Sequence, residues 1–140
     1  MQTNGLARFV KAQESDFNQA LQEVIDGRKH SHWMWYIFPQ IQGLGYSETA
    51  RYYAIHDLKE ADEYLQHPVL GERLLRITAE LLKHDRSASQ IFGSPDDLKL
   101  HSSMTLFGEV EGASPLFEQV LKKFFKGKKD ENTLKLLAKL

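Results

Sequence analysis

Cysteine is absent from this 140-residue sequence, and its absence removes several classes of protein at once. Without cysteine there is no disulfide framework, no thiolate metal site and no cysteine nucleophile. Long apolar runs are missing too: the longest, residues 33–38, has six residues, whereas a membrane-spanning helix needs roughly 20. The first five residues lack the basic and then apolar stretch of a signal peptide. We therefore expect a cytoplasmic protein with no membrane span.

A strong excess of charge of either sign is missing as well. The 18 Lys and Arg residues nearly balance the 19 Asp and Glu residues, which leaves a formal net charge of -1. This balance argues against a dedicated polyanion-binding protein. Hydrophobic residues make up 41% of the chain, too many for a disordered one. A length of 140 residues is typical of one domain, so we expect a single globular domain over residues 1–140.

Helix signals follow one another along the chain. Apolar residues recur every three or four positions in several segments, and capping residues or glycines bound these segments. Ser15 is expected to begin a helix over residues 16–26 that ends at Gly27, after a shorter helix over residues 6–13. Further helices are expected over residues 48–54, 58–65, 68–84, 87–93, 115–127 and 131–138. The predicted fold class is therefore all-α, a compact single-domain bundle of about seven to nine short helices.

Residues 98–106 are the one ambiguous segment. Every second position from Leu98 to Leu106 suits a half-buried strand, whereas Leu100, Met104 and Phe107 fit the spacing of a helix. The sequence before this segment is typical of a helix start, and no partner strand is evident elsewhere. We therefore favour a helix.

Aromatic side chains gather in one part of the sequence. Seven of the fifteen fall within residues 33–53, where a uniform spread would place about two. Basic and imidazole side chains precede them at residues 28–32, and the cluster includes a glycine-containing loop at residues 39–45. Aromatic rings stack on planar groups and cations bind phosphates, so this composition indicates a pocket for a flat, anionic ligand. The alternative is that residues 33–38 form an apolar helix in the core.

A second polar strip, residues 95–105, is the candidate for the opposite wall of such a pocket. On a helix, Asp96, Lys99 and Ser103 share a face, and Ser103 also falls on the apolar stripe, at a buried or pocket-lining position. The alternative is that the acidic residues only complement the helix N-terminus while the serines bond to the preceding turn.

Together the two strips define one predicted site, provided that they meet in the fold. Its ligand-binding residues are Lys29, Trp33, Trp35, Gln40, Lys99 and Ser103, and its candidate catalytic residues are His32 and Asp96. The lysines would hold the anionic group, a tryptophan would stack on the ligand, and His32 or Asp96 would transfer protons. The sequence contains no metal-binding motif, so we expect no metal and no cofactor.

Two motifs are distinctive: HWMWYIFPQ at residues 32–40 and SSMTLF at residues 102–107. With them, and with further similarity along essentially the whole chain, the sequence resembles a mainly bacterial family of small proteins catalogued as a domain of unknown function. This resemblance implies an all-α fold and a stand-alone domain, and no particular reaction. One departure is His101, where the family pattern has arginine or lysine. Members are sometimes mislabelled calpastatin, although true calpastatins are long, repeat-built and largely disordered.

The sequence leaves two classes of function open. The first is a small-ligand-binding protein or enzyme for a nucleotide-like or ADP-ribose-like anion. The alternative is a protein–protein interaction module, an adaptor or antitoxin-like subunit, which predicts an exposed aromatic patch rather than a concave one. Seven lysines in the last twenty residues are more typical of a solvated helix face than of a nucleic-acid surface, so we expect no nucleic-acid partner. The pattern indicates no particular oligomeric state.

Overall fold

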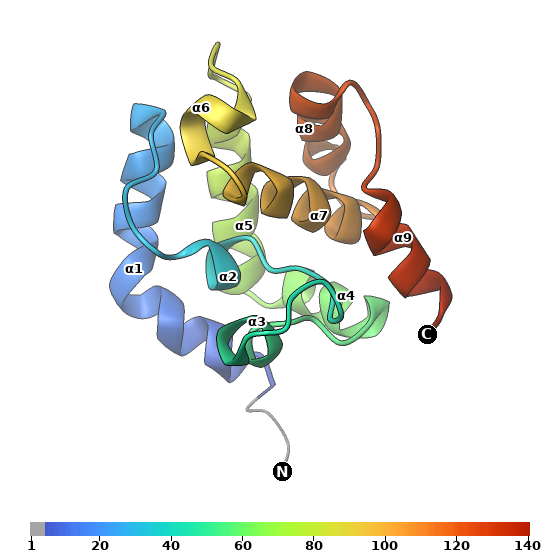
Figure 1. Ribbon diagram of the computed structural model, residues 1–140. Helices are drawn as coiled ribbons and strands as arrows, with labels where there is room; N and C mark the ends of the chain where they lie inside the picture. Colours follow the sequence, from blue (N-terminus) through green and yellow to red (C-terminus); the bar gives the residue numbers. More distant parts are fainter. Residues whose placement is uncertain (1–4) are drawn as a thin grey trace.

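The computed structural model describes residues 5–140, which form nine α-helices packed around one hydrophobic core (Figure 1). The helices are α1 (Ala7–Asp26), α2 (Met34–Ile37), α3 (Glu48–Tyr52), α4 (Leu58–Gln66), α5 (Leu70–Leu81), α6 (Ala88–Phe92), α7 (Asp96–Gly108), α8 (Pro115–Phe125) and α9 (Glu131–Ala138). Within the described residues, strand-like pairing is limited to an isolated bridge between Ile41 and Ile55. The predicted all-α fold of about seven to nine helices is confirmed. Residues 1–4, which belong to the segment searched for a signal peptide, lie outside the described residues.

Helix α7 is the centre of the fold, and it contacts α4, α6, α8 and α9 (Figure 1). Every side chain from Ser102 to Phe107 is buried, as is that of Leu100. A helix enclosed on nearly all sides has no polar stripe, which explains why this segment also matched the alternation of a strand. The predicted helix over residues 98–106 is confirmed.

Helix α1 corrects one sequence-based expectation. The chain is a continuous helix from Ala7 to Asp26, and Ser15 is an exposed residue within it rather than the cap of a second helix. Gln13, although polar, is buried on the same face as the apolar residues, so the buried stripe of α1 runs through this position. Its amide donates hydrogen bonds to the carbonyl of Tyr36 (2.7 Å) and the hydroxyl of Tyr64 (2.9 Å). Such partners on other elements are invisible to a periodicity argument.

Local capping sets most of the other helix starts. The side chain of the residue before each of five helices accepts a hydrogen bond from a backbone N–H of the first turn: Ser47, Asp57, Ser87, Ser114 and Asp130. These caps replace hydrogen bonds that the first turn of a helix lacks. No helix of residues 5–140 combines the length and the apolarity that crossing a membrane requires.

The face of the molecule that bears the candidate site is formed by α2, the loop after it and α3. In Figure 1 this stretch of chain passes in front of the core, with α7 above the loop and α3 below it. The loop is rich in backbone turns, and it is joined to the segment after α3 by hydrogen bonds from the Ile55 N–H to the Gln40 carbonyl (2.8 Å) and from the Gln42 N–H to the Ile55 carbonyl (2.9 Å). These bonds fix residues 40–42 relative to the segment that follows α3.

Candidate functional site

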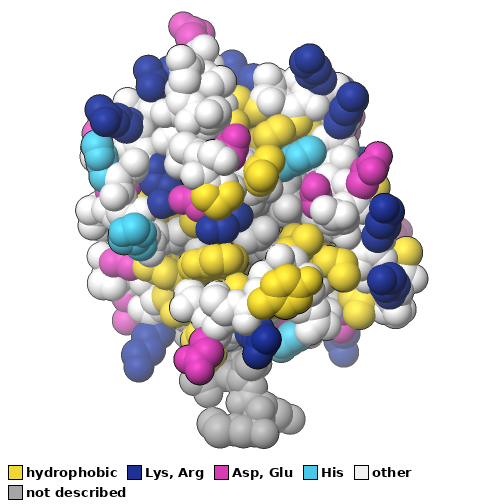
Figure 2. Space-filling view, viewed as in Figure 1, with side chains coloured by type: hydrophobic (Ala, Val, Ile, Leu, Met, Phe, Trp, Pro, Cys, Tyr) yellow, Lys and Arg dark blue, Asp and Glu magenta, His cyan; other side chains and the backbone are white. Residues whose placement is uncertain are grey.

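A hollow of about 370 Å³ lies where α2 and its loop face the first turns of α7 and the start of α9. It is lined by Trp35, Gln40, Leu44, Gly45, Pro95, Leu98, Lys99, Ser102, Asp130 and Asn132. Figure 2 shows hydrophobic side chains gathered across the centre of this face, with basic side chains above and below them. Both strips that the sequence singled out therefore contribute to one concave surface.

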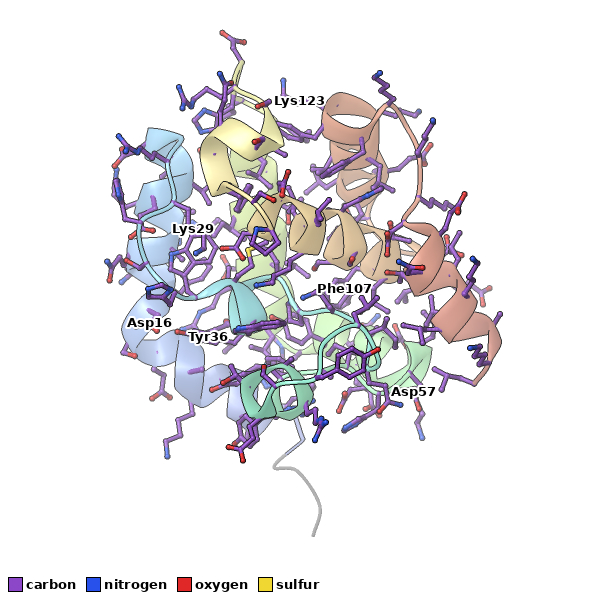
Figure 3. The ribbon with its side chains drawn as sticks, in the orientation of Figure 1. Asp16, Lys29, Tyr36, Asp57, Phe107 and Lys123 are labelled. Atoms are coloured by element: carbon purple, nitrogen blue, oxygen red, sulfur yellow. The ribbon has the colours of Figure 1, made fainter. Side chains whose placement is uncertain are left out.

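The carboxylate of Asp96 joins the two strips. Nζ of Lys29, in the loop after α1 (Figure 3), lies 2.8 Å from one carboxylate oxygen. Nζ of Lys99, one turn along α7, lies 2.9 Å from the other. The side chain of Lys29 is 8% exposed, that of Lys99 is 21% exposed and that of Asp96 is 19% exposed. Burial alone would raise the pKa of Asp96, but the hydrogen bonds and charges of the two lysines outweigh it and lower the pKa. Two cations on one anion give these three side chains together a charge of +1, which faces the carboxylate of Asp130 in the lining of the hollow.

Each of these ammonium groups also lies over an indole. Nζ of Lys29 is 5.1 Å from the ring centroid of Trp33, and Nζ of Lys99 is 4.1 Å from that of Trp35, distances at which a cation is attracted to the ring. The two indoles differ in exposure: Trp33 is 1% exposed and packs against Phe92 in the core, whereas Trp35 is partly exposed and lines the hollow.

Glu23, on the last turns of α1, holds the loop that carries Lys29. Its Oε1 accepts hydrogen bonds from the backbone N–H groups of His30 (2.7 Å) and Ser31 (3.0 Å) and from the indole N–H of Trp33 (2.9 Å). Burial would raise the pKa of Glu23, but these bonds and one from the Ser31 hydroxyl lower it to about 2. Glu23 is thus a buried anion that fixes the course of residues 30–33.

Five of the eight predicted site residues come together around the hollow. Trp35, Gln40 and Lys99 line it, while Lys29 and Asp96 join Lys99 through the ion pairs. Asp96 is ionised and has an ammonium group on each oxygen, so it is better suited to hold the two lysines than to transfer protons.

The other three predicted residues lie away from the hollow. Trp33 is in the core with its N–H bound by Glu23, and Ser103 is fully buried with a hydroxyl that has no partner among the described residues. His32 is exposed, but it precedes α2 on the side held to α1, where the hydroxyl of Tyr36 donates to Asp16 (Figure 3). Of the two indoles, Trp35 is the one that lines the hollow.

Sequence reasoning missed Ser102, the serine that does line the hollow. Its hydroxyl donates to the carbonyl of Leu98 (3.1 Å) and to Oδ2 of Asp130 (3.3 Å), the residue that caps α9. By helical spacing, Ser102 and Ser103 can both share a face of α7 with Lys99, because they follow it by three and four positions. Only the packing of α7 selects between them. Across residues 5–140 we find no cluster of three or more His, Asp or Glu side chains able to hold a metal ion.

These features define a small all-α protein with a hollow that is lined by an aromatic ring and by one of the two lysines that contact Asp96. The chain belongs to the family described as "Protein of unknown function (DUF1810)", whose model matches residues 3–137. Its structure is similar to the crystal structure of the conserved hypothetical protein Rv1873 from Mycobacterium tuberculosis, with a TM-score of 0.93 and 47% sequence identity over 95% of this chain and 96% of that one. No protein of curated function matches. The family resemblance and the all-α fold that it implied are confirmed.

Proposed function

We propose that the hollow binds a small anionic ligand with a flat ring, in the class of nucleotide-like or ADP-ribose-like molecules. The observation that carries this proposal is the pairing of two lysines with the single carboxylate of Asp96 beside the accessible indole of Trp35. One of those lysines, Lys99, lines the hollow itself. An anion bound there gains a charge-assisted hydrogen bond.

Lys99 can turn toward a ligand without leaving Asp96 unpaired. Lys29 is 8% exposed and remains 2.8 Å from the carboxylate, so the anion keeps one ammonium partner when the other leaves. Leaving this partly buried carboxylate without a partner would be destabilising. The second lysine removes this penalty, and the ammonium group of Lys99 is therefore available to a ligand.

The remaining lining supports a ligand that also has a planar part. Trp35 and Leu44 offer apolar surface, and Gln40 and Asn132 offer carboxamides that both donate and accept hydrogen bonds. The carboxylate of Asp130 is already bound by the backbone N–H and the hydroxyl of Thr133, so its repulsion of an anion is reduced. Such a mixture of apolar walls and few polar groups is typical of small-molecule sites.

Calorimetry and thermal-shift measurements with AMP and ADP-ribose test the proposal. We expect the wild-type protein to bind at least one of them and to melt at a higher temperature in its presence. Lys99→Ala should weaken binding by about tenfold or more, because the anion loses its charged partner. The matched control is Lys83→Ala, which removes another lysine paired with a carboxylate three residues away, at 2.9 Å from Glu80. Absence of binding, or equal binding by the Lys99→Ala variant, would overturn the proposal.

A protein–protein interaction module is the second candidate, and two exposed apolar side chains favour it: Leu98, which lines the hollow, and Tyr46, in the loop before α3. Tyr46 is 79% exposed and Leu98 is 59% exposed. Exposed apolar groups of this size are typical of contact surfaces when they are contiguous. Partner binding would be weakened by Leu98→Ser and Tyr46→Ser and retained by Lys99→Ala. Ligand binding in the hollow predicts the stronger effect for Lys99→Ala.

A further inference from the structure

A second hollow, of about 200 Å³, adjoins the first. Trp35, Gln40, Leu44 and Gly45 line both, so the two hollows meet along a common wall. The second is completed on its other side by residues of α3 and its surroundings, among them Arg51, Tyr46 and Tyr53. None of the predicted site residues beyond Trp35 and Gln40 belongs to it.

Arg51 brings a free positive charge to this second hollow. It is exposed, and within residues 5–140 its guanidinium forms neither an ion pair nor a side-chain hydrogen bond. The lining of this hollow includes no Asp or Glu, so no anion of the protein competes for the guanidinium. The charge that Lys99 supplies on one side of the common wall thus has a counterpart on the other.

Local structure holds α3, and with it Arg51, close to the common wall. The hydroxyl of Ser47 accepts a hydrogen bond from the Ala50 N–H (3.1 Å) and begins the helix. Gly45 permits the close approach: a Cβ at this position would lie 2.7 Å from Cβ of Ala50 and 3.5 Å from the edge of the Trp35 ring. A larger residue in place of the glycine would push the loop and α3 apart.

We infer that the two hollows form one extended site for a ligand with two separated anionic groups, in which Lys99 binds one group and Arg51 binds the other. This inference rests on the proposed function and narrows its ligand class to nucleotides with a second phosphate remote from the first. An arginine suits the second position, because its planar fork binds a phosphate through two parallel hydrogen bonds.

Calorimetric titration with AMP and with adenosine 3′,5′-bisphosphate separates the two positions. We expect wild-type protein to bind the bisphosphate about tenfold more tightly than AMP, because only the bisphosphate reaches both cations. Arg51→Ala should abolish this difference, because it lowers the affinity for the bisphosphate by about tenfold more than the affinity for AMP. Lys99→Ala should weaken the binding of both ligands. The matched control is Arg76→Ala, an exposed arginine of α5 that lines neither hollow.

The outcomes distinguish this inference from the function on which it rests. If wild-type protein binds AMP and the bisphosphate equally well, or if Arg51→Ala keeps the preference, the extended site is wrong and the anion site at Lys99 stands. If Arg76→Ala reduces the preference as much as Arg51→Ala does, the effect is a general attraction to the positive surface, and the inference is overturned. If neither ligand binds, the proposed function and the extended site both fall.

Discussion

Trp33 and Trp35 stand two residues apart in the same motif, and each has a lysine ammonium over its ring, yet they lie in different environments. The surroundings of Trp33 are closed: its N–H is bound by Glu23, its ring packs in the core and 1% of its surface is exposed. Those of Trp35 are open, since it lines two hollows and the cation above it faces one of them.

The comparison shows how one set of residue types serves two purposes. A carboxylate, an indole and a lysine form a structural unit where water is excluded and the polar atoms have partners within the protein. The same three groups form a candidate binding site where the carboxylate has two lysine partners and space remains beside the ring. The two arrangements differ in the number of cations that contact the carboxylate and in the exposure of the indole.

The largest expected effect separates the two tryptophans by stability. Trp33→Ala should lower the free energy of unfolding by about 3–5 kcal/mol, because it opens a cavity in the core and leaves Glu23 without one donor. Trp35→Ala should lower it by about 1 kcal/mol, because that ring is partly solvated. Chemical denaturation of both variants measures the contrast. Equal losses would contradict the division into a closed and an open indole.

The next largest expected effect is a pH dependence of stability that Glu23, the hydrogen-bond partner of Trp33, should cause. The pKa of Glu23 in the folded protein, about 2, lies below its ordinary value of 4.5, so the unfolded chain takes up the proton first as the pH falls. The stabilisation by ionised Glu23 is therefore complete above about pH 5 and lost progressively toward about pH 2. Glu23→Gln should be about 2–3 kcal/mol less stable than wild type at neutral pH, and this gap should narrow in acid.

Denaturation at several pH values checks this prediction, with Glu14→Gln as the control. Glu14 is an exposed residue of the same helix, and its variant should differ from wild type by about 0.5 kcal/mol or less at neutral pH. A gap between wild type and Glu23→Gln that stays constant from neutral pH to about pH 3 would mean that the carboxylate is not the group that titrates.

A smaller effect distinguishes the two lysines of Asp96. Lys29→Met should lower the free energy of unfolding by about 1–3 kcal/mol, because the ammonium is buried and also donates to the carbonyl of Ser31. Lys99→Met should cost about 1 kcal/mol or less, since Asp96 keeps its buried partner. Nucleotide affinity should show the reverse order, with the larger loss for Lys99→Met. The same order in both measurements would contradict separate structural and binding roles.

The smallest expected effect is that of substituting His32, which precedes Trp33 in the sequence and lines neither hollow. His32→Ala should change the free energy of unfolding by about 0.5 kcal/mol or less, as exposed substitutions usually do. It should also leave the affinity for AMP within about twofold of wild type. A tenfold loss of affinity on calorimetric titration would extend the site to this side of α2.

Most of the fold was predictable because its signals are local. The capping side chains of Ser47, Ser87 and Asp130 bond within a few residues of their own positions, and Gly27 ends α1 in the left-handed conformation that glycine favours. The unbroken length of α1 was missed because it depends on Gln13, whose partners belong to other helices.

The sequence by itself determined that this chain is all-α and that Asp96 and Lys99 share one helical face, because periodicity and capping act between near neighbours. Only the tertiary structure decided that Lys29 reaches Asp96, that Trp33 faces the core while Trp35 faces outward, and that Arg51 stands beside the same ring. Residues 33–38 are apolar on every side, so no pattern within them fixes how α2 is turned about its axis. The elements packed around it set that rotation, and with it the position of the site.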